Sequence, residues 1–188
     1  MRIGVVSDTH GFFEPRLAEL LAGVEAILHA GDAGSEEVLD GLRSIAPVYA
    51  VRGSMDPPSL DLPPALSGQF EDIQVEVLHQ LQIPQAELQK WSDGGLLGRM
   101  HPERREAFLK SFGEATRVVV FGHSHTPCLL TLCHRLFFNP GSAGKQRFSL
   151  PRCCGLLEVF PRGVRGELLS LEQYNEELPG RVWLPVGG

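Results

Sequence analysis

The chain has 188 residues, of which 43% are hydrophobic and 21% are charged. This is the composition of a globular protein, and we expect residues 1–188 to form a single domain. The net charge of −6 and the pI of about 5.6 argue against a protein that holds nucleic acid by charge alone, because such proteins usually carry a basic surface.

The sequence shows no pattern typical of secretion or membrane insertion. The apolar run Ile3–Val6 is too short for a signal-peptide core or a membrane span, and the polar run Ser7–His10 follows it. The four cysteines form no CxxC pair, and Cys153 and Cys154 are adjacent, which is poor disulfide geometry. We therefore expect a cytoplasmic protein with reduced thiols and no membrane contact.

The first third of the chain alternates between strand and helix patterns. Short apolar runs predict strands, and apolar residues at helical spacing predict helices, with Ser35 as the N-cap of the second helix. The expected strands are Arg2–Ser7, Ala26–Ala30 and Val48–Val51, and the expected helices are Phe13–Ala22 and a helix from Ser35 to about Arg43. This alternation indicates a βαβ arrangement with parallel strands.

The rest of the chain favours strands, with two short helices. Prolines at positions 57, 58, 63 and 64 predict an extended loop, the glycine-rich segment Ser92–Met100 predicts a mobile loop, and the last residues show no pattern. The expected helices are Gln85–Trp91 and Pro102–Phe112, and the expected strands are Ile73–Leu78, Arg117–Phe121, Leu129–Leu132, Leu136–Phe138, Gly155–Phe160 and Val164–Leu171. The last four strands are expected to form two hairpins.

Side chains of the type that binds metal ions follow several of these strands, where open α/β sheets place their ligand sites. Asp8 and His10 come directly after the first strand, and strand alternation would let both point the same way. Asp32 follows Gly31 after the second strand, and its two carboxylate oxygens suit it to bridge two cations. Each signal alone is weak, because aspartate and histidine are common in loops.

The clearest single signal is the pair His123 and His125, two imidazoles that follow the strand Arg117–Phe121. His79 ends the strand Ile73–Leu78 and offers a further imidazole. The remaining histidines, His29, His101 and His134, have no partner at useful spacing, and we interpret them as structural or surface residues.

After the third strand, Ser54 offers a hydroxyl and Asp56 a carboxylate. Asp56 either faces the site, where it would be a candidate catalytic residue, or braces its own loop. We favour the bracing role.

Taken in chain order, these segments resemble the motifs of the calcineurin-like metallophosphoesterase superfamily. They are Asp8-x-His10, Gly31-Asp32, Gly53-x-x-Asp56, His79 and Gly122-His123-x-His125, and the resemblance runs from Met1 to about Phe160. The segment Asn139-Pro140-Gly141-Ser142 resembles a loop of the small YfcE-like phosphodiesterases in that superfamily. The resemblance implies an α/β fold, a four-layer αββα sandwich with mixed sheets, and a metal-dependent phosphoric ester hydrolase, above all a phosphodiesterase.

The resemblance also implies a dinuclear metal site. One divalent ion would be held by Asp8, His10, Asp32 and His125, and the second by Asp32, Ser54, His79 and His123. Manganese, iron, nickel and zinc all suit such mixed oxygen and nitrogen ligands. A metal-activated water would then attack phosphorus in line. The substrate would be a small phosphate ester or a nucleotide, and inorganic phosphate a product. Nucleic acid is not an expected partner, and the sequence does not predict an oligomeric state.

Three positions depart from the family pattern. The family usually has asparagine where this chain has Ser54, many members have histidine where it has Met55, and the small group usually has glycine where it has Gln80. A hydroxyl is a poorer ligand than an amide oxygen, so the second metal site is expected to be weak. The departures also leave open a catalytically degenerate fold that serves as a protein-interaction scaffold, as the small retromer subunit does.

Methionine cannot donate a proton to a leaving group, and this leads to a prediction about substrates. We expect measurable hydrolysis of diesters with good leaving groups such as nitrophenolate, and poor hydrolysis of alkyl diesters. The measurement is the kcat/KM of both classes at saturating Mn²⁺. Equal values would show that a missing general acid does not limit this enzyme.

Overall fold

The computed structural model describes residues 1–92, 102–146, 149–172 and 180–186. Within these residues the predicted α/β character is confirmed. The helices are α1 (Arg16–Leu20), α2 (Glu36–Arg43), α3 (Gln85–Trp91) and α4 (Pro102–Lys110), with a short 3₁₀ helix η1 (Pro58–Leu60). The strands are β1 (Arg2–Val6), β2 (Ala26–His29), β3 (Val48–Ala50), β4 (Ala65–Phe70), β5 (Ile73–Leu78), β6 (Thr116–Val120), β7 (Cys128–Leu132), β8 (Arg135–Asn139), β9 (Cys153–Phe160), β10 (Gly163–Ser170) and β11 (Arg181–Pro185).

The strands form two mixed sheets. The first has the order β11-β10-β9-β1-β2-β3, in which β1, β2 and β3 are parallel and β9 pairs antiparallel with β1. The second has the order β4-β5-β6-β8-β7, in which β5, β6 and β8 are parallel. Strands β1 and β6 at the centre of the two sheets carry runs of buried apolar residues, as strands covered on both faces do, whereas β5 alternates.

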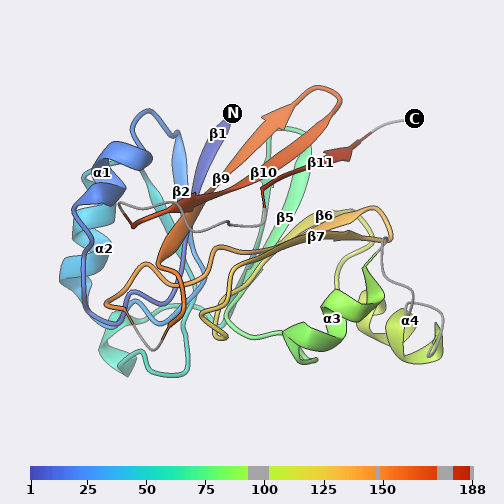
Figure 1. Cartoon of the computed structure of the whole chain (residues 1–188), viewed down its shortest axis with the longest axis horizontal. Coiled ribbons are helices and arrows are strands. Elements are labelled where there is room, and N and C mark those ends of the chain that lie inside the picture. The colour runs from blue at the N-terminus through green and yellow to red at the C-terminus, as the bar shows by residue number, and fades with distance from the viewer. Residues whose placement is uncertain (93–101, 147–148, 173–179, 187–188) are drawn as a thin grey trace.

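The two sheets pack face to face, and helices cover the outer face of each (Figure 1). The core between the sheets includes Leu28, Val75, Val120, Phe138 and Leu157. A second cluster joins α1 and α2 to the first sheet, and a third joins α3 and α4 to the second sheet. The predicted four-layer αββα sandwich is therefore confirmed.

Several boundaries differ from the sequence prediction. The first helix is shorter than Phe13–Ala22, because Pro15 occupies its N-cap position and Gly23 has a φ of 75°. The proline-rich segment is not wholly extended, since Pro58 begins a 3₁₀ turn, where a proline loses no helical hydrogen bond. Strands β4 and β11 were not predicted, because both are edge strands with few buried side chains.

One further local prediction is confirmed. Ser35 stands at the N-cap of α2, although its hydroxyl makes no capping hydrogen bond. All four cysteines are free, and burial raises the pKa of the Cys128 thiol to about 12. The predicted mobile loop Ser92–Met100 lies, apart from Ser92, outside the described residues, as does His101. No helix in the described part of the chain is both long and apolar enough to cross a membrane.

The core between the sheets yields a stability prediction. Leu136 on β8 is fully buried there, so Leu136→Ala should lower the free energy of unfolding by about 2–5 kcal/mol through lost burial and a cavity. Leu20→Ala, on the partly buried face of α1, is the matched control and should cost clearly less. Denaturant titration measures both, and similar losses for the two variants would contradict the assigned core.

Candidate metal centre

Six of the seven predicted metal ligands gather where strands of both sheets end. Asp8 and His10 follow β1 and Asp32 follows β2 in the first sheet. His79 follows β5, and both His123 and His125 follow β6, in the second sheet. The site therefore joins the carboxyl ends of parallel strands from the two sheets, which no single supersecondary unit supplies.

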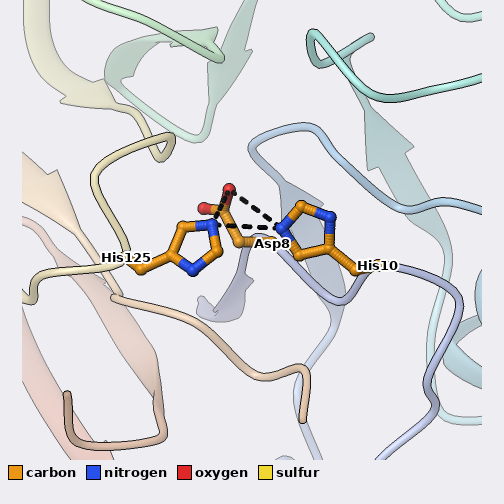
Figure 2. A group of neighbouring side chains, drawn as sticks. All are labelled: Asp8, His10 and His125. Carbon is orange, nitrogen blue, oxygen red and sulfur yellow. Dashed lines mark hydrogen bonds and ion pairs between the residues drawn. The ribbon is translucent and has the colours of Figure 1, made fainter. Parts of the chain in front are cut away.

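The first ligand group consists of Asp8, His10 and His125 (Figure 2). Oδ1 of Asp8 lies 3.3 Å from Nε2 of His125 and 3.9 Å from Nε2 of His10. The two Nε2 atoms lie 3.1 Å apart. Three potential donor atoms thus point at one small volume.

The carboxylate of Asp8 shows what this volume suits. Its Oδ2 accepts hydrogen bonds from the Ser7 hydroxyl at 2.6 Å and the His123 N–H at 3.0 Å. Its Oδ1 is buried and has no hydrogen-bond partner among the described residues. A buried carboxylate oxygen without a donor is costly, and a cation between it and two imidazole nitrogens would remove that cost. The residues therefore fit a divalent metal ion.

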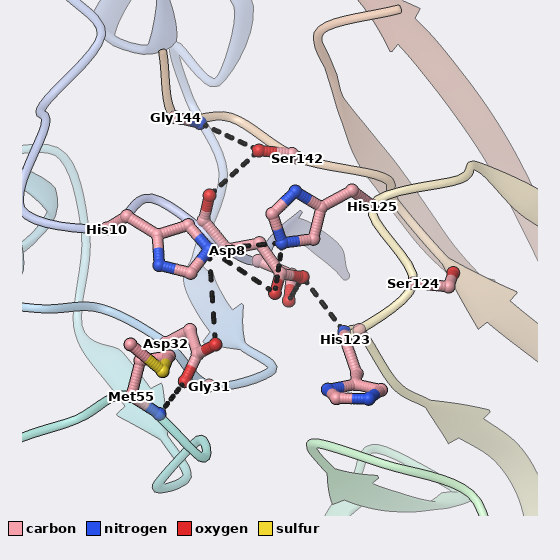
Figure 3. Close-up of polar contacts among 12 residues, drawn as sticks. Asp8, His10, Gly31, Asp32, Met55, His123, Ser124, His125, Ser142 and Gly144 are labelled. Atoms are coloured by element: carbon pink, nitrogen blue, oxygen red, sulfur yellow. Dashed lines mark hydrogen bonds and ion pairs between the residues drawn. The ribbon is translucent and has the colours of Figure 1, made fainter. Parts of the chain in front are cut away.

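The second ligand group consists of Asp8, Asp32 and His79. Figure 3 shows its two carboxylates. Oδ2 of Asp32 lies 3.4 Å from Nε2 of His79 and 3.9 Å from Nε2 of His10. Nε2 of His79 in turn lies 3.3 Å from Nδ1 of His123. One carboxylate oxygen thus faces histidines of both groups.

Hydrogen bonds orient His79 and Asp32 in this second group. The Nδ1–H of His79 donates to the Ala30 carbonyl at 2.8 Å, which leaves Nε2 to face Asp32. Burial raises the pKa of Asp32, but the facing His79 imidazole and the hydrogen bond from the Met55 N–H outweigh it and bring this pKa down to about 2. Asp32 is therefore an anion at neutral pH, as a metal ligand must be.

The backbone at these residues is strained. Asp8, His10, Asp32, His123 and His125 all have φ between 49° and 69°, a left-handed conformation that few non-glycine residues adopt. The expectation that Asp8 and His10 share a direction through strand alternation is wrong, because β1 ends at Val6 and a turn aims them. Strain of this kind costs about 1–3 kcal/mol per residue and concentrates at functional sites.

Two glycines make room for the ligands. A Cβ at position 53 would lie 2.1 Å from Oδ1 of Asp32, and one at position 122 would lie 2.6 Å from Oδ2 of Asp8. Any side chain at either position would displace a candidate ligand. The glycines of the Gly53-x-x-Asp56 and Gly122-His123 motifs are therefore explained by close approach of the backbone to a carboxylate.

Asp56 does not face the ligand groups. Its Oδ2 accepts hydrogen bonds from the N–H groups of Asp32 at 2.9 Å and Gly53 at 2.8 Å, and its Oδ1 accepts one from Gly34 at 2.7 Å. It therefore ties the loop after β3 to the loop after β2, as the bracing interpretation holds. Ser54 is exposed, and the neighbouring Met55 donates its N–H to Oδ1 of Asp32 at 2.7 Å.

Some supporting residues carried no signal in the sequence. Gln85 accepts hydrogen bonds from the Ser124 hydroxyl at 2.8 Å and the Asn139 amide at 2.9 Å, and donates to the Thr126 carbonyl at 3.0 Å. It thereby holds the loop that carries His123 and His125. A glutamine at the start of a helix is common in sequences, and only the fold brings it to this loop.

Two of the histidines interpreted as structural or surface residues are placed by the structure. His29 is structural, with Nδ1 accepting the Gly31 N–H at 3.2 Å and Nε2 lying 3.0 Å from the Thr9 hydroxyl. Burial lowers the pKa of His29 to about 4, so it is neutral at physiological pH. His134 is exposed, in the turn between β7 and β8.

The fold and the site together define a phosphoesterase of the metal-dependent α/β type, and comparison with known proteins agrees. The model of the calcineurin-like phosphoesterase superfamily domain matches residues 1–160. A probable metallophosphoesterase of Methanocaldococcus jannaschii is 34% identical over 159 residues, covering 81% of this chain and 71% of its own. A probable metallophosphoesterase of Methanothermobacter thermautotrophicus is 31% identical over 181 residues, which cover 92% of this chain and 91% of that protein.

Solved structures agree in fold. Vps29 of Entamoeba histolytica, complexed with Zn²⁺, matches with a TM-score of 0.71 at 20% identity, over 98% of this chain and 99% of that chain. A novel archaeal phosphodiesterase matches with a TM-score of 0.64 at 21% identity, over 90% of this chain and all of that chain. This chain belongs to the calcineurin-like phosphoesterase superfamily, a family of metal-dependent phosphoric ester hydrolases, and the predicted enzyme class is thereby confirmed.

The position of Asp32 between these histidines leads to a test by metal-linked stability. At a Mn²⁺ concentration of about one hundred times the Kd, the wild-type Tm should rise by about 5–10 °C, because only the folded state binds the ion. Asp32→Ala should lose most of this rise. Differential scanning calorimetry with and without Mn²⁺ measures it.

The matched control is Asp72→Ala, which removes an exposed carboxylate from the turn between β4 and β5. It should keep the full rise. A rise that persists in Asp32→Ala would place the bound ion elsewhere.

Proposed function

We propose that this chain is a phosphodiesterase that works with one firmly held divalent ion and a second, weaker one. The observation that carries the proposal is the position of Asp32 between two groups of histidines, beside the buried and unpartnered oxygen of Asp8. The two curated relatives named probable metallophosphoesterases and the archaeal phosphodiesterase of the same fold support it. The substrate class is a small phosphate ester or nucleotide.

The side chains of Asp8, His10, Asp32 and His125 would hold the first ion. Those of Asp32, His79 and His123 would hold the second, with Ser54 as a poor additional ligand. When bound, the ions neutralise charge on the phosphoryl oxygens and lower the pKa of a water molecule at the site. Manganese, iron, nickel and zinc all suit this donor set. We also propose a single domain over residues 1–188 and a cytoplasmic location.

The protein's own contribution is to hold the ligands before the substrate arrives. The carbonyl of Ala30 fixes the ring of His79 through a hydrogen bond. The carboxylate of Asp56 accepts a hydrogen bond from the Asp32 N–H and so fixes the turn that carries Asp32. Ser142 donates its hydroxyl to the Asp8 carbonyl at 2.8 Å and so fixes the turn that carries Asp8. Ligands held in this way need little reorganisation during the reaction, and this preorganisation is a main source of enzymatic rate enhancement.

The alternative is an interaction scaffold that has lost catalysis. The observations that favour it are the exposed Ser54 and the Met55 side chain, which is 71% exposed and carries no ionisable group. The strained backbone at five candidate ligands argues for the enzyme, because strain without a function would be lost to mutation. Protein that contains no metal after purification without chelator would count against the enzyme, and turnover by the metal-loaded protein separates the two.

The direct test is hydrolysis of bis-p-nitrophenyl phosphate by metal-stripped protein, with and without Mn²⁺. We expect turnover that depends on Mn²⁺ and that falls by at least about a hundredfold in Asp32→Ala, since a misplaced ion loses its alignment with the substrate. Release of nitrophenolate is followed by absorbance. Absence of turnover with Mn²⁺, Ni²⁺ and Zn²⁺ despite bound metal would favour the scaffold.

A further inference from the structure

A pocket of about 410 Å³ lies beside the candidate metal centre, lined by the segments 80–85 and 121–124. These segments follow β5 and β6, the strands that carry His79 and His123. His123 lines the pocket, and its Nδ1 also lies 3.3 Å from Nε2 of His79. In Figure 3, the side chain of Ser124 points away from Asp8, His10 and His125. The pocket therefore adjoins His123 and reaches along the segment that follows β5.

One wall of the pocket is apolar. Leu81, Ile83 and Phe121 line it but are only 7%, 9% and 1% exposed, so the exposed Pro84 is the apolar residue that a flat group can contact most fully. Among the described residues that line it, His123 alone is ionisable, and none is lysine or arginine. A second phosphate or a carboxylate on the substrate would therefore find no cation here. An uncharged group is favoured.

Polar side chains at the mouth of the pocket add a requirement. Gln80 and Gln82 are exposed and line it, and each amide offers both a donor and an acceptor. Gln85 and Ser124 line it too, but they hydrogen bond to each other and hold the loop of His123. The occupant is therefore a flat, uncharged group whose edge both donates and accepts hydrogen bonds.

A nucleobase has these properties, and the volume lies in the range of about 300–1,000 Å³ that is usual for small-molecule sites. We propose that the pocket binds the base of a nucleoside phosphodiester, and that Gln80 and Gln82 determine specificity for it. The inference rests on the proposed function and narrows its substrate class. It also gives Gln80, a departure from the family pattern, a role of its own.

The test compares two esters with the same leaving group in the presence of Mn²⁺. They are the p-nitrophenyl ester of thymidine monophosphate and methyl p-nitrophenyl phosphate, in which a nucleoside and a methyl group stand at the same position. We expect kcat/KM to favour the nucleoside ester by at least about tenfold. Gln80→Leu and Gln82→Leu should each lower this ratio by about threefold to tenfold, the effect of one lost hydrogen bond or slightly more.

The control variant is Gln69→Leu, an exposed glutamine on β4 that does not line this pocket, and it should leave the ratio unchanged. A second readout is independent of turnover: calorimetric binding of thymidine monophosphate and of methyl phosphate to the Mn²⁺-loaded protein. Absence of turnover on both esters would count against the proposed function, while the binding preference still decides the pocket. Equal binding of the two phosphates, or a preference unchanged in both glutamine variants, would overturn the inference.

Discussion

The site depends on a short ladder of backbone hydrogen bonds that ties the loop after β1 to the loop after β2. The N–H groups of Asp8, His10 and Gly11 donate to the carbonyls of Gly31, Asp32 and Ala33 at 3.0, 2.9 and 2.8 Å. Such bonds hold Asp8, His10 and Asp32 in the left-handed conformation that aims their side chains inward. Without the ladder, the cost of that conformation would release the ligands.

A second set of contacts brings the other sheet to the same point. The His123 N–H donates to Asp8, and the His79 ring donates to the Ala30 carbonyl at the end of β2. Both bonds cross from one sheet to the other, so the geometry of the site depends on how the two sheets pack. A change that shifts the sheets by a fraction of an ångström would separate the histidines from the carboxylates.

These contacts also explain which parts of the molecule are predictable from the amino-acid sequence. The order of the motifs, each at the end of an apolar strand, is enough to place Asp8, Asp32 and His123 in one region. Apolar runs and turn residues predict nearly all the paired strands inside the sheets, because burial dictates their composition. The edge strands β4 and β11 escape prediction, since half-exposed strands carry little pattern.

The means by which the ligands are aimed is not readable from sequence. Strand alternation is the wrong reason for the shared direction of Asp8 and His10, because left-handed backbone at aspartate and histidine leaves no mark in composition. The bracing role of Asp56 is favoured by sequence, but its three N–H partners come from loops that only the fold brings together. Gln85 and the pocket beside His123 arise only when β5, α3 and β6 are packed together.

The central claim is that strained turns from two sheets present one set of metal ligands. The most direct measurement is a crystal structure of the protein grown with Mn²⁺, with an anomalous difference map at the manganese edge. The account predicts a strong peak bonded to Asp8, Asp32 and the Nε2 atoms of His10 and His125, with a weaker one beside His79 and His123. A map with manganese bound only at other side chains, or with no peak among these residues, would contradict it.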